Sequence, residues 1–311
     1  MKHPILITGA AGFIGSNLAR YLVNKKIKVN IIVKKSSSLW RLKDITKYLK
    51  IYYADISDKH KIKNIIKKIK PKTIFHLATH GAYSEQNNLF KIKKSTLDAT
   101  FNLLNECKKY KFNTFINTGS SSEYGFKNKS MKETDLLTPN SYYSVFKSSS
   151  TLYCQYESLK SNLQIVTVRP FHIYGPFESY KRLIPTLIRK MINKKKIRLV
   201  SPDISRDLIY IDDAIKFYLM IAKKKGLKGE IFNLASGKKT TIKEIYNLIK
   251  SITNYKKINK WGSMKNRSWD QKIWYGDMSY VKNKLNWKPK VSLKKGLEKT
   301  VNWYKKFNNE N

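Results

Sequence analysis

The chain has little of what a disulfide-linked, zinc-bound or membrane-spanning protein needs. Its 311 residues include two cysteines, Cys107 and Cys154, too few for a disulfide framework or a zinc cluster. No run approaches 18 consecutive apolar residues, and the apolar start leads into glycines rather than a cleavage site. We therefore expect neither a membrane span nor a signal peptide, and a cytoplasmic, reduced protein whose two cysteines lie in the core.

Acidic residues and arginine are also scarce. The 63 Lys plus Arg outnumber the 21 Asp plus Glu, giving a formal net charge of +42, and only eight of the basic residues are arginine, which leaves 55 lysines. Surfaces that read phosphates or bases favour arginine for its bidentate fork, whereas these lysines are scattered in pairs and triplets. We favour a solvated lysine-rich surface and expect no specific nucleic-acid partner; the alternative predicts steeply salt-dependent nucleic-acid binding.

Short β-branched runs alternate with amphipathic stretches through the first half of the chain, which predicts an α/β fold with a doubly wound parallel sheet. The expected strands are 5–8, 29–33, 51–53, 73–77, 114–117 and 165–168, with a late one at 231–234. The expected helices are 14–24, 60–69, 95–110 and 143–161. We expect one domain over 1–170 plus about 207–235, and a smaller C-terminal α/β domain over 171–206 and 236–311.

A glycine-rich loop follows the first expected strand and opens the first helix. Residues 8–15 read Thr-Gly-Ala-Ala-Gly-Phe-Ile-Gly. Gly9 permits the tight turn, Gly12 lets the backbone approach a pyrophosphate and Gly15 lets the helix pack on the sheet, while the helix N-terminus favours an anion. Three glycines alone are a weak signal, but the strand-turn-helix context favours a dinucleotide in a Rossmann-type domain over a structural turn.

The acidic residue that usually closes the second strand of such a domain is missing. The strand ends instead in Lys34, Lys35 and three serines from Ser36, with Arg41 nearby. A carboxylate there would bind the adenosine 2′-hydroxyl, whereas lysines and hydroxyls suit a 2′-phosphate, so NADP(H) is favoured and NAD(H) stays open. The two lysines also fit the general lysine excess. Asp55, after the third strand, is placed either to reach the adenine or to cap its strand.

Tyr143 and Lys147 are four residues apart at the start of an expected helix, so they share one face. A phenol with a pKa near 10 is a poor base at neutral pH, but a nearby ammonium favours the phenolate. Such pairs occur by chance in a lysine-rich chain. This one gains weight from the strand and turn before it, Thr118-Gly-Ser-Ser-Ser-Glu-Tyr-Gly125, whose hydroxyls could polarise a sugar hydroxyl or carbonyl.

Together these motifs resemble the extended short-chain dehydrogenase/reductases, and more narrowly the nucleotide-sugar epimerases, dehydratases and ketoreductases. The resemblance also rests on Arg-Pro-Phe-His-Ile-Tyr-Gly-Pro at 169–176 and Arg-Asp-Leu-Ile-Tyr-Ile-Asp-Asp at 206–213. The motifs keep the family's order and spacing from residue 5 to about residue 304. The resemblance implies that the larger domain binds the cofactor and the smaller one the nucleotide sugar.

The resemblance implies roles for individual residues. Tyr143 would be the general acid/base at the sugar C4 oxygen, Lys147 would hold the nicotinamide ribose, and Ser120 would share the bond to that oxygen. The implied cofactor-binding residues are Gly9, Ala11, Gly12, Phe13, Ile14, Lys34, Lys35, Ser36, Arg41, Asp55, Ile56, Leu77, Ala78, Thr79, Tyr143 and Lys147. The implied substrate-binding residues are Ser84, Ser121, Ser122, His172, Arg206 and Arg267, with the two arginines on the diphosphate or paired with Asp207 and Asp270.

Departures from the family pattern narrow the expected reaction. The 4,6-dehydratases place a carboxylate three residues before the Tyr-Gly glycine, where this chain has Ser122; Glu123 comes one residue later, and turn geometry should aim it elsewhere. His172 stands where many relatives have a substrate-contacting Asn, and packing is the favoured interpretation. His76 and His80 are four apart but lack a third ligand, so no metal is expected.

The resulting hypothesis is an enzyme that transfers a hydride at C4 of a nucleoside-diphosphate hexose, as a 4-epimerase or a 4-ketoreductase. A 4,6-dehydratase is the alternative within the family. A non-catalytic NADP-binding regulator and a nucleic-acid-binding protein are the alternatives from other classes. The resemblance also implies a homodimer, formed through the helices near 95–110 and 143–161.

Overall fold

The computed structural model describes residues 1–83, 85–264 and 271–309, and the chain divides into two compact units. Unit 1 comprises Met1–Gly125, Leu136–Pro170 and Ile215–Phe232; unit 2 comprises Phe126–Asp135, Phe171–Ala214 and Asn233–Asn311. The division falls within β10 and α7. The segment 126–135 thus groups with the C-terminal part of the chain.

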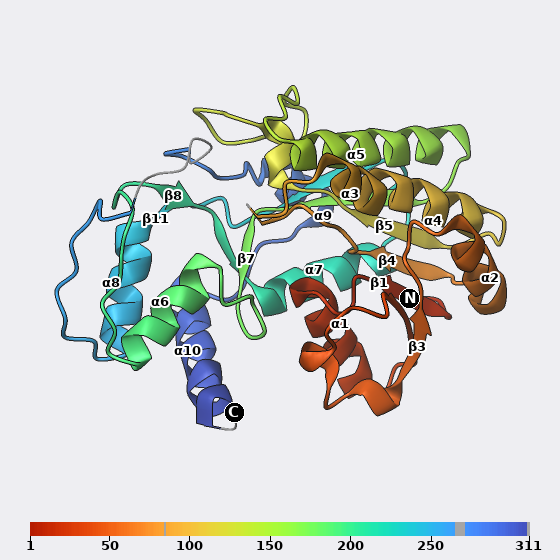
Figure 1. Cartoon of the computed structure of the whole chain (residues 1–311). Coiled ribbons are helices and arrows are strands. Elements are labelled where there is room, and N and C mark those ends of the chain that lie inside the picture. Colours follow the sequence, from red (N-terminus) through yellow and green to blue (C-terminus); the bar gives the residue numbers. More distant parts are fainter. Residues whose placement is uncertain (84, 265–270, 310–311) are drawn as a thin grey trace. The chain divides into compact units, whose positions relative to one another are not determined.

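Unit 1 is built on a sheet of seven described strands in the order β10-β6-β5-β4-β1-β2-β3 (Figure 1). The strands are β1 (Ile5–Thr8), β2 (Val29–Val33), β3 (Leu49–Tyr53), β4 (Thr73–His76), β5 (Thr114–Thr118), β6 (Ile165–Pro170) and β10 (Ile231–Leu234). The pairs among β1 to β6 are all parallel. The order reverses between β1 and β4, and ligands of such sheets bind beyond the carboxyl ends of the strands at that point. The predicted doubly wound Rossmann-type fold is confirmed.

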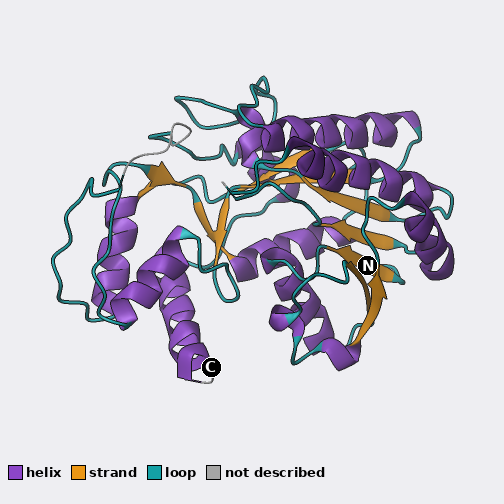
Figure 2. Ribbon diagram, viewed as in Figure 1, coloured by secondary structure: helices purple, strands orange, loops and turns teal. Residues whose placement is uncertain are grey.

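Helices cover both faces of this sheet (Figure 2). They are α1 (Phe13–Asn24), α2 (Lys59–Ile69), α3 (Leu89–Lys93), α4 (Ala99–Lys108), α5 (Tyr142–Lys160) and α7 (Ile211–Lys223). Isoleucines of α2, Leu103 and Leu104 of α4 and Cys154 of α5 bury one common apolar cluster against the sheet. Both cysteines are free and fully buried, as expected, and burial raises the pKa of each thiol.

The helix expected over 95–110 is wrong in its bounds. Helical structure begins at Leu89, because Asn88 caps it by accepting from Lys91 N, and a π-helical turn (Lys94–Asp98) separates α3 from α4. The Ser95 hydroxyl donates to Lys91 O at 2.6 Å, a local bond of the type that distorts helices.

Unit 2 has short strands that the sequence did not predict, because two or three residues give no alternating pattern. They are β7 (His172–Tyr174), parallel to β9 (Leu208–Tyr210), and β8 (Ser205–Arg206), antiparallel to β11 (Thr240–Thr241). Its helices are α6 (Leu183–Ile192), α8 (Ile242–Ile252), α9 (Ser279–Leu285) and α10 (Leu293–Asn309). A capping box of Thr241 and Glu244 begins α8.

Candidate active site

The glycine loop after β1 has the geometry of a pyrophosphate cradle. Gly9 has φ +72°, and a Cβ there would lie 2.6 Å from Ala78 N, so this loop packs directly on the backbone that follows β4. A Cβ on Gly15 would lie 2.3 Å from Gly9 O. Gly12 is the N-cap of α1, and among the described residues no side chain caps that end and no acidic residue stands in its first turn. The loop and the helix N-terminus therefore fit a dinucleotide phosphate group.

The predicted loop residues lie together with those beyond β4. Ala11, Phe13 and Ile14 continue the loop into α1. Ala78 N donates to Thr8 Oγ1 at 3.4 Å, and Leu77 N to Thr8 O at 3.2 Å. The structure thus brings the first loop and the segment Leu77–Thr79 to one place at the carboxyl ends of β1 and β4. The exposed Thr79 bonds Thr96 Oγ1 at 3.2 Å.

The residues after β2 and β3 also come together. Lys34 is exposed, and its ammonium lies 3.0 Å from Asp55 Oδ2. Burial alone would raise the pKa of Asp55, but hydrogen bonds from Ser57 and Lys34 hold it at about 2. Its Oδ1 accepts from Ser57 N and Oγ, as in a turn-capping aspartate. The contact of Asp55 with the adenine stays a prediction.

Arg41, Lys35, Ser36 and Ile56 are the other predicted cofactor-binding residues that follow β2 and β3. Arg41 donates to Ala11 O at 3.3 Å, so its positive charge lies beside the glycine loop. Lys35 and Ser36 are exposed, and Ile56 is buried.

His76 is a satisfied core histidine at the end of β4. Its Nδ1 lies 2.8 Å from Thr8 Oγ1 and its Nε2 lies 2.9 Å from Thr100 Oγ1. Burial, helped by the charge of Lys147, lowers the pKa of His76 to about 3, so the ring is neutral. Burial also lowers the pKa of His80, together with the charges of nearby lysines. No cluster of three or more metal-ligating side chains occurs among the described residues.

The serine turn follows β5. Ser120 is the N-cap of a short 3₁₀ helix, η4 (Ser121–Tyr124), and its hydroxyl accepts from Ser122 N at 3.1 Å and Ser122 Oγ at 2.8 Å. Ser121 is buried, while Ser120 and Ser122 are partly exposed. The turn therefore has two linked hydroxyls with access to solvent.

Tyr143 and Lys147 lie on the first two turns of α5. Ser141 caps this helix by accepting from Ser144 N, which sets the helix start just before Tyr143. The Lys147 ammonium lies 5.9 Å from the Tyr143 ring centroid and donates to Thr118 O at 2.6 Å. Burial lowers the pKa of Lys147 to about 8, while the charge of Glu123 acts in the opposite direction. At neutral pH this buried amine still carries its proton.

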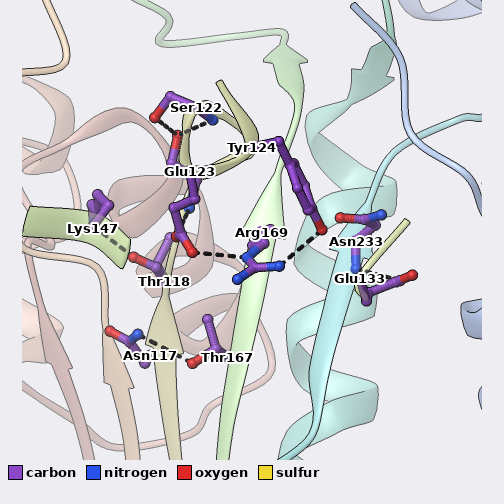
Figure 3. A network of polar contacts seen from close by, with 11 residues as sticks. Asn117, Thr118, Ser122, Glu123, Tyr124, Glu133, Lys147, Thr167, Arg169 and Asn233 are labelled. Carbon is purple, nitrogen blue, oxygen red and sulfur yellow. Dashed lines mark hydrogen bonds and ion pairs between the residues drawn. The ribbon is translucent and has the colours of Figure 1, made fainter. Parts of the chain in front are cut away.

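A buried ion pair underlies the serine turn, and sequence reasoning did not find it. Glu123 Oε1 accepts from Ser120 N at 2.7 Å and Oε2 accepts from Arg169 Nε at 2.8 Å, with no exposed surface on Glu123. Arg169 also donates to Tyr124 Oη at 3.0 Å (Figure 3). Both carboxylate oxygens of Glu123 are thus engaged within the protein. The sequence signal that could have found this pair is a charged residue in each of two segments of otherwise apolar or small residues, Glu123 in the turn after β5 and Arg169 near the end of β6.

Of the described substrate candidates, Ser121 and Ser122 belong to unit 1, and Arg206 and His172 belong to unit 2. Arg206 of β8 donates to Ser205 O at 2.9 Å and Gln271 O at 2.8 Å. The neighbouring Asp207 is buried and accepts from Ser236 and from the backbone of two glycines. His172 is mostly buried, its Nδ1 has no hydrogen-bond partner among the described residues, and burial with the charges of Arg206 and Arg182 lowers its pKa to about 3. Ser84, Arg267 and Asp270 lie outside the described residues.

No helix in the described ranges is both long enough and apolar enough to cross a bilayer.

Comparison with known proteins gives consistent results. A model described as "NAD dependent epimerase/dehydratase family" matches residues 5–235. The chain is 30% identical to a dTDP-D-glucose 4,6-dehydratase of Dictyostelium discoideum, over 99% of this chain and 82% of the relative. It is 29% identical to a UDP-glucuronate 4-epimerase of Thermodesulfobacterium geofontis, over 96% and 95%.

Solved structures resemble the fold throughout. A UDP-glucose 4-epimerase of Thermotoga maritima, crystallised with UDP-glucose, gives a TM-score of 0.90 at 27% identity, covering 97% of this chain and 99% of that one. A UDP-glucuronic acid 4-epimerase of Bacillus cereus, in complex with UDP-glucuronic acid and NAD, gives 0.86 at 26% identity, with 97% and 99% covered. The likeness thus extends across both units.

Proposed function

The chain belongs to the NAD dependent epimerase/dehydratase family, and on that premise we propose that it oxidises and reduces C4 of a nucleoside-diphosphate hexose. The observation that carries the proposal is the pairing of Tyr143 with a buried, protonated Lys147 on α5, whose ammonium donates to Thr118 O at the end of β5. Unit 1 would bind the nicotinamide cofactor, and unit 2, through Arg206 and His172, the nucleotide sugar.

The chain's own residues would move the proton. Tyr143 would take the proton of the C4 hydroxyl and return it, because the ammonium of Lys147 favours the phenolate. Ser120 would bind the same oxygen, and Lys147 would hold the ribose hydroxyls of the cofactor. When bound, the nicotinamide supplies the acceptor and donor for the C4 hydride.

Among the outcomes of this chemistry we place 4-epimerisation first and dehydration last. A 4,6-dehydratase needs a carboxylate to remove the C5 proton, and Ser122 stands at that position. Glu123 is engaged by Arg169 and Ser120 N with no exposed surface, so it is not available to a substrate. Relatives named as 4-epimerases at 26–29% identity and a relative named as a 4,6-dehydratase at 30% identity all cover nearly the whole chain, so the order rests on Ser122 and Glu123 and not on the relatives' names.

A 4-ketoreductase is the second candidate, favoured by the basic residues after β2. We propose that the chain accepts NADP(H), because Arg41 reaches the glycine loop and no acidic residue ends β2. Lys34, although paired with Asp55, would share the contact to a 2′-phosphate with Arg41, Lys35 and Ser36. Neighbouring structures contain NAD, which makes NAD(H) the cofactor to test beside it.

We also propose a cytoplasmic location and a homodimer, and the outer face of α5 supports the homodimer. Val145, Leu152, Tyr156 and Leu159 recur at helical spacing and are exposed, the last at 66%. Phe101 of α4 is also half exposed. Four such apolar side chains on one helix face are typical of a self-association surface. Light scattering should give twice the monomer mass of 36.4 kDa, and Leu152→Glu should reduce it to the monomer.

The test of the activity uses purified protein with UDP-, dTDP-, GDP- and CDP-hexoses and their 4-keto forms, with NAD(H) or NADP(H). NMR should detect the C4 epimer of one sugar and a cofactor that survives gel filtration. An empty protein that oxidises NADPH with a 4-keto sugar would instead support the reductase. No turnover of any sugar would contradict the proposal.

A substitution tests the assignment of the acid/base. Tyr143→Phe should lower kcat about 10²- to 10⁴-fold and leave the cofactor Kd unchanged, because only the proton carrier is lost. Tyr142→Phe is the matched control, since this neighbour on the same turn is 56% exposed, and it should leave both values as they are. Equal activity in both variants would exclude Tyr143 as the acid/base.

A further inference from the structure

Among the described residues of unit 1, Glu123 and Arg169 form the most deeply buried ion pair, with exposed fractions of 0% and 1%. Taking both charges out of water is expensive, and well-packed apolar residues would fill the same space at no loss of stability. A buried ion pair therefore points to a functional role where its partners contact residues of an active site. Here it does, because both partners lie directly beneath the serine turn (Figure 3).

The carboxylate of Glu123 is built into the backbone of that turn. Its Oε1 accepts from Ser120 N at 2.7 Å, and a Cβ on Gly119 would lie 2.4 Å from the same oxygen. Any side chain at 119 would therefore push the carboxylate off the turn. Arg169 fixes the other oxygen and is itself held by Tyr124, whose ring centroid lies 4.7 Å from its Cζ.

The same short segment receives Lys147. The ammonium donates to Thr118 O, two residues before the amide that Glu123 accepts. The groups that act on this ammonium are Glu123 from η4, His76 from β4, and Tyr143 and Cys154 from α5. Arg169 of β6, which packs on α5, is the cation paired with Glu123. His76 is neutral, and burial raises the pKa of Cys154 so that its thiol is neutral too. Of these described groups, Glu123 carries the negative charge.

We infer that Glu123, held by Arg169, is a positioning residue of the active site: it fixes the Ser120 backbone and is the counter-charge of the buried Lys147 ammonium. The inference rests on the proposed function, because it takes Lys147 as the residue that holds the cofactor ribose. It does not make Glu123 a proton donor or acceptor for the substrate. Its effect passes through Ser120 and Lys147.

The experiment measures cofactor affinity against pH, without substrate, by quenching of protein fluorescence with NADH or NADPH. In the unsubstituted protein the affinity should fall as the pH rises through about 8, where Lys147 loses its proton. Glu123→Gln keeps an acceptor for Ser120 N but removes the charge. Because it also leaves Arg169 without a counter-charge, the decisive variant is the double substitution Glu123→Gln, Arg169→Met, which removes both charges.

The double variant should fold, with a Tm near that of the unsubstituted protein, and its affinity midpoint should lie about one pH unit lower. At pH 8 it should bind the cofactor about fivefold more weakly, and at pH 6 equally well. Glu106→Gln is the matched control: Glu106 of α4 is 4% exposed and paired with Lys109 at the end of that helix, and its loss should leave the midpoint in place.

A double variant with the wild-type midpoint would show that the pair is only structural, and so overturn the inference. A wild-type affinity without a midpoint between pH 7 and 9 would overturn it as well. The result is independent of the proposed activity, since no sugar is present. A shifted midpoint in a protein that turns over none of the sugars would sink the 4-epimerase and leave the charge relation between Glu123 and Lys147 intact.

Discussion

The two units satisfy a buried carboxylate in different ways. Glu123 in unit 1 faces a guanidinium, whereas Asp207 in unit 2 accepts from Ser236 N and Oγ, each at 2.6 Å, and from Gly237 N and Gly276 N at 2.9 and 3.1 Å. Burial raises the pKa of Asp207 and these bonds oppose the rise. The charge of Glu123 is therefore balanced by its partner, whereas Asp207 is held by neutral donors from the segments that it joins.

The largest expected effect comes from breaking the Asp207 arrangement. Asp207→Ala would leave one hydroxyl and three backbone N–H groups of segments 236–237 and 276 without their acceptor, at about 3–5 kcal/mol of unfolding free energy in total. Urea denaturation measures the loss. Asp207→Asn is the control and should lose less, because one amide oxygen still accepts. A change below about 1 kcal/mol in the alanine variant would show that this carboxylate does not hold the segments together.

A matched pair of glycine substitutions sharpens the comparison. A Cβ on Gly119 meets Glu123 Oε1, and a Cβ on Gly276 would lie 2.9 Å from Ala235 Cβ and 3.0 Å from the Phe171 ring. Each alanine should cost about 2–3 kcal/mol by overpacking, measured by thermal and urea unfolding. Gly119→Ala should in addition lower the pH midpoint of cofactor affinity, and Gly276→Ala should not. Equal pH midpoints of cofactor affinity in the two glycine variants would show that displacing Glu123 does not change the charge balance at Lys147.

Acid should destabilise both units, because each has one histidine whose pKa is about 3. A folded-state pKa below the unfolded value of 6.5 means that the neutral ring contributes full stability above pH 6.5, which is lost as the pH falls toward 3. For His76, 2% exposed, the loss is about 2 kcal/mol at pH 5.

The loss for His172 should be of similar size, because its pKa is also about 3. Urea midpoints between pH 7 and 5 measure both. His76→Asn and His172→Asn should each flatten the acid decline, and a decline that stays unchanged in one of them would contradict a neutral ring at that position.

The sequence predicted unit 1 far better than unit 2, for reasons visible in particular residues. Thr8 to Gly15, or Tyr143 with Lys147, are local patterns whose spacing alone implies their geometry. Glu123 and Arg169 are 46 residues apart, and they meet only because β5 and β6 pair in the register Thr118 with Val168. No local pattern encodes that register.

The polar contacts of unit 2 depend on the tertiary fold in the same way. Asp207 and Gly276 are 69 residues apart, and the strands of this unit are too short for a periodic signal. The roles of the candidate site residues stay predictions, because they require a bound cofactor and sugar to be tested.

The smallest expected effect concerns the exposed counterpart of the Glu123–Arg169 pair. Lys34 and Asp55 lie 3.0 Å apart with side chains 46% and 37% exposed, so water screens their attraction. Lys34→Gln should therefore change the unfolding free energy by less than about 1 kcal/mol. If the end of β2 binds a 2′-phosphate, the same variant should weaken NADPH binding more than NADH binding, by up to about tenfold at low salt. Lys25→Gln, on the last turns before β2, is the control and should leave the ratio of the two Kd values unchanged. A Lys34 variant with an unchanged ratio would leave Arg41 as the cation to test next, since its bond to Ala11 O holds it at the glycine loop whatever charge stands at 34.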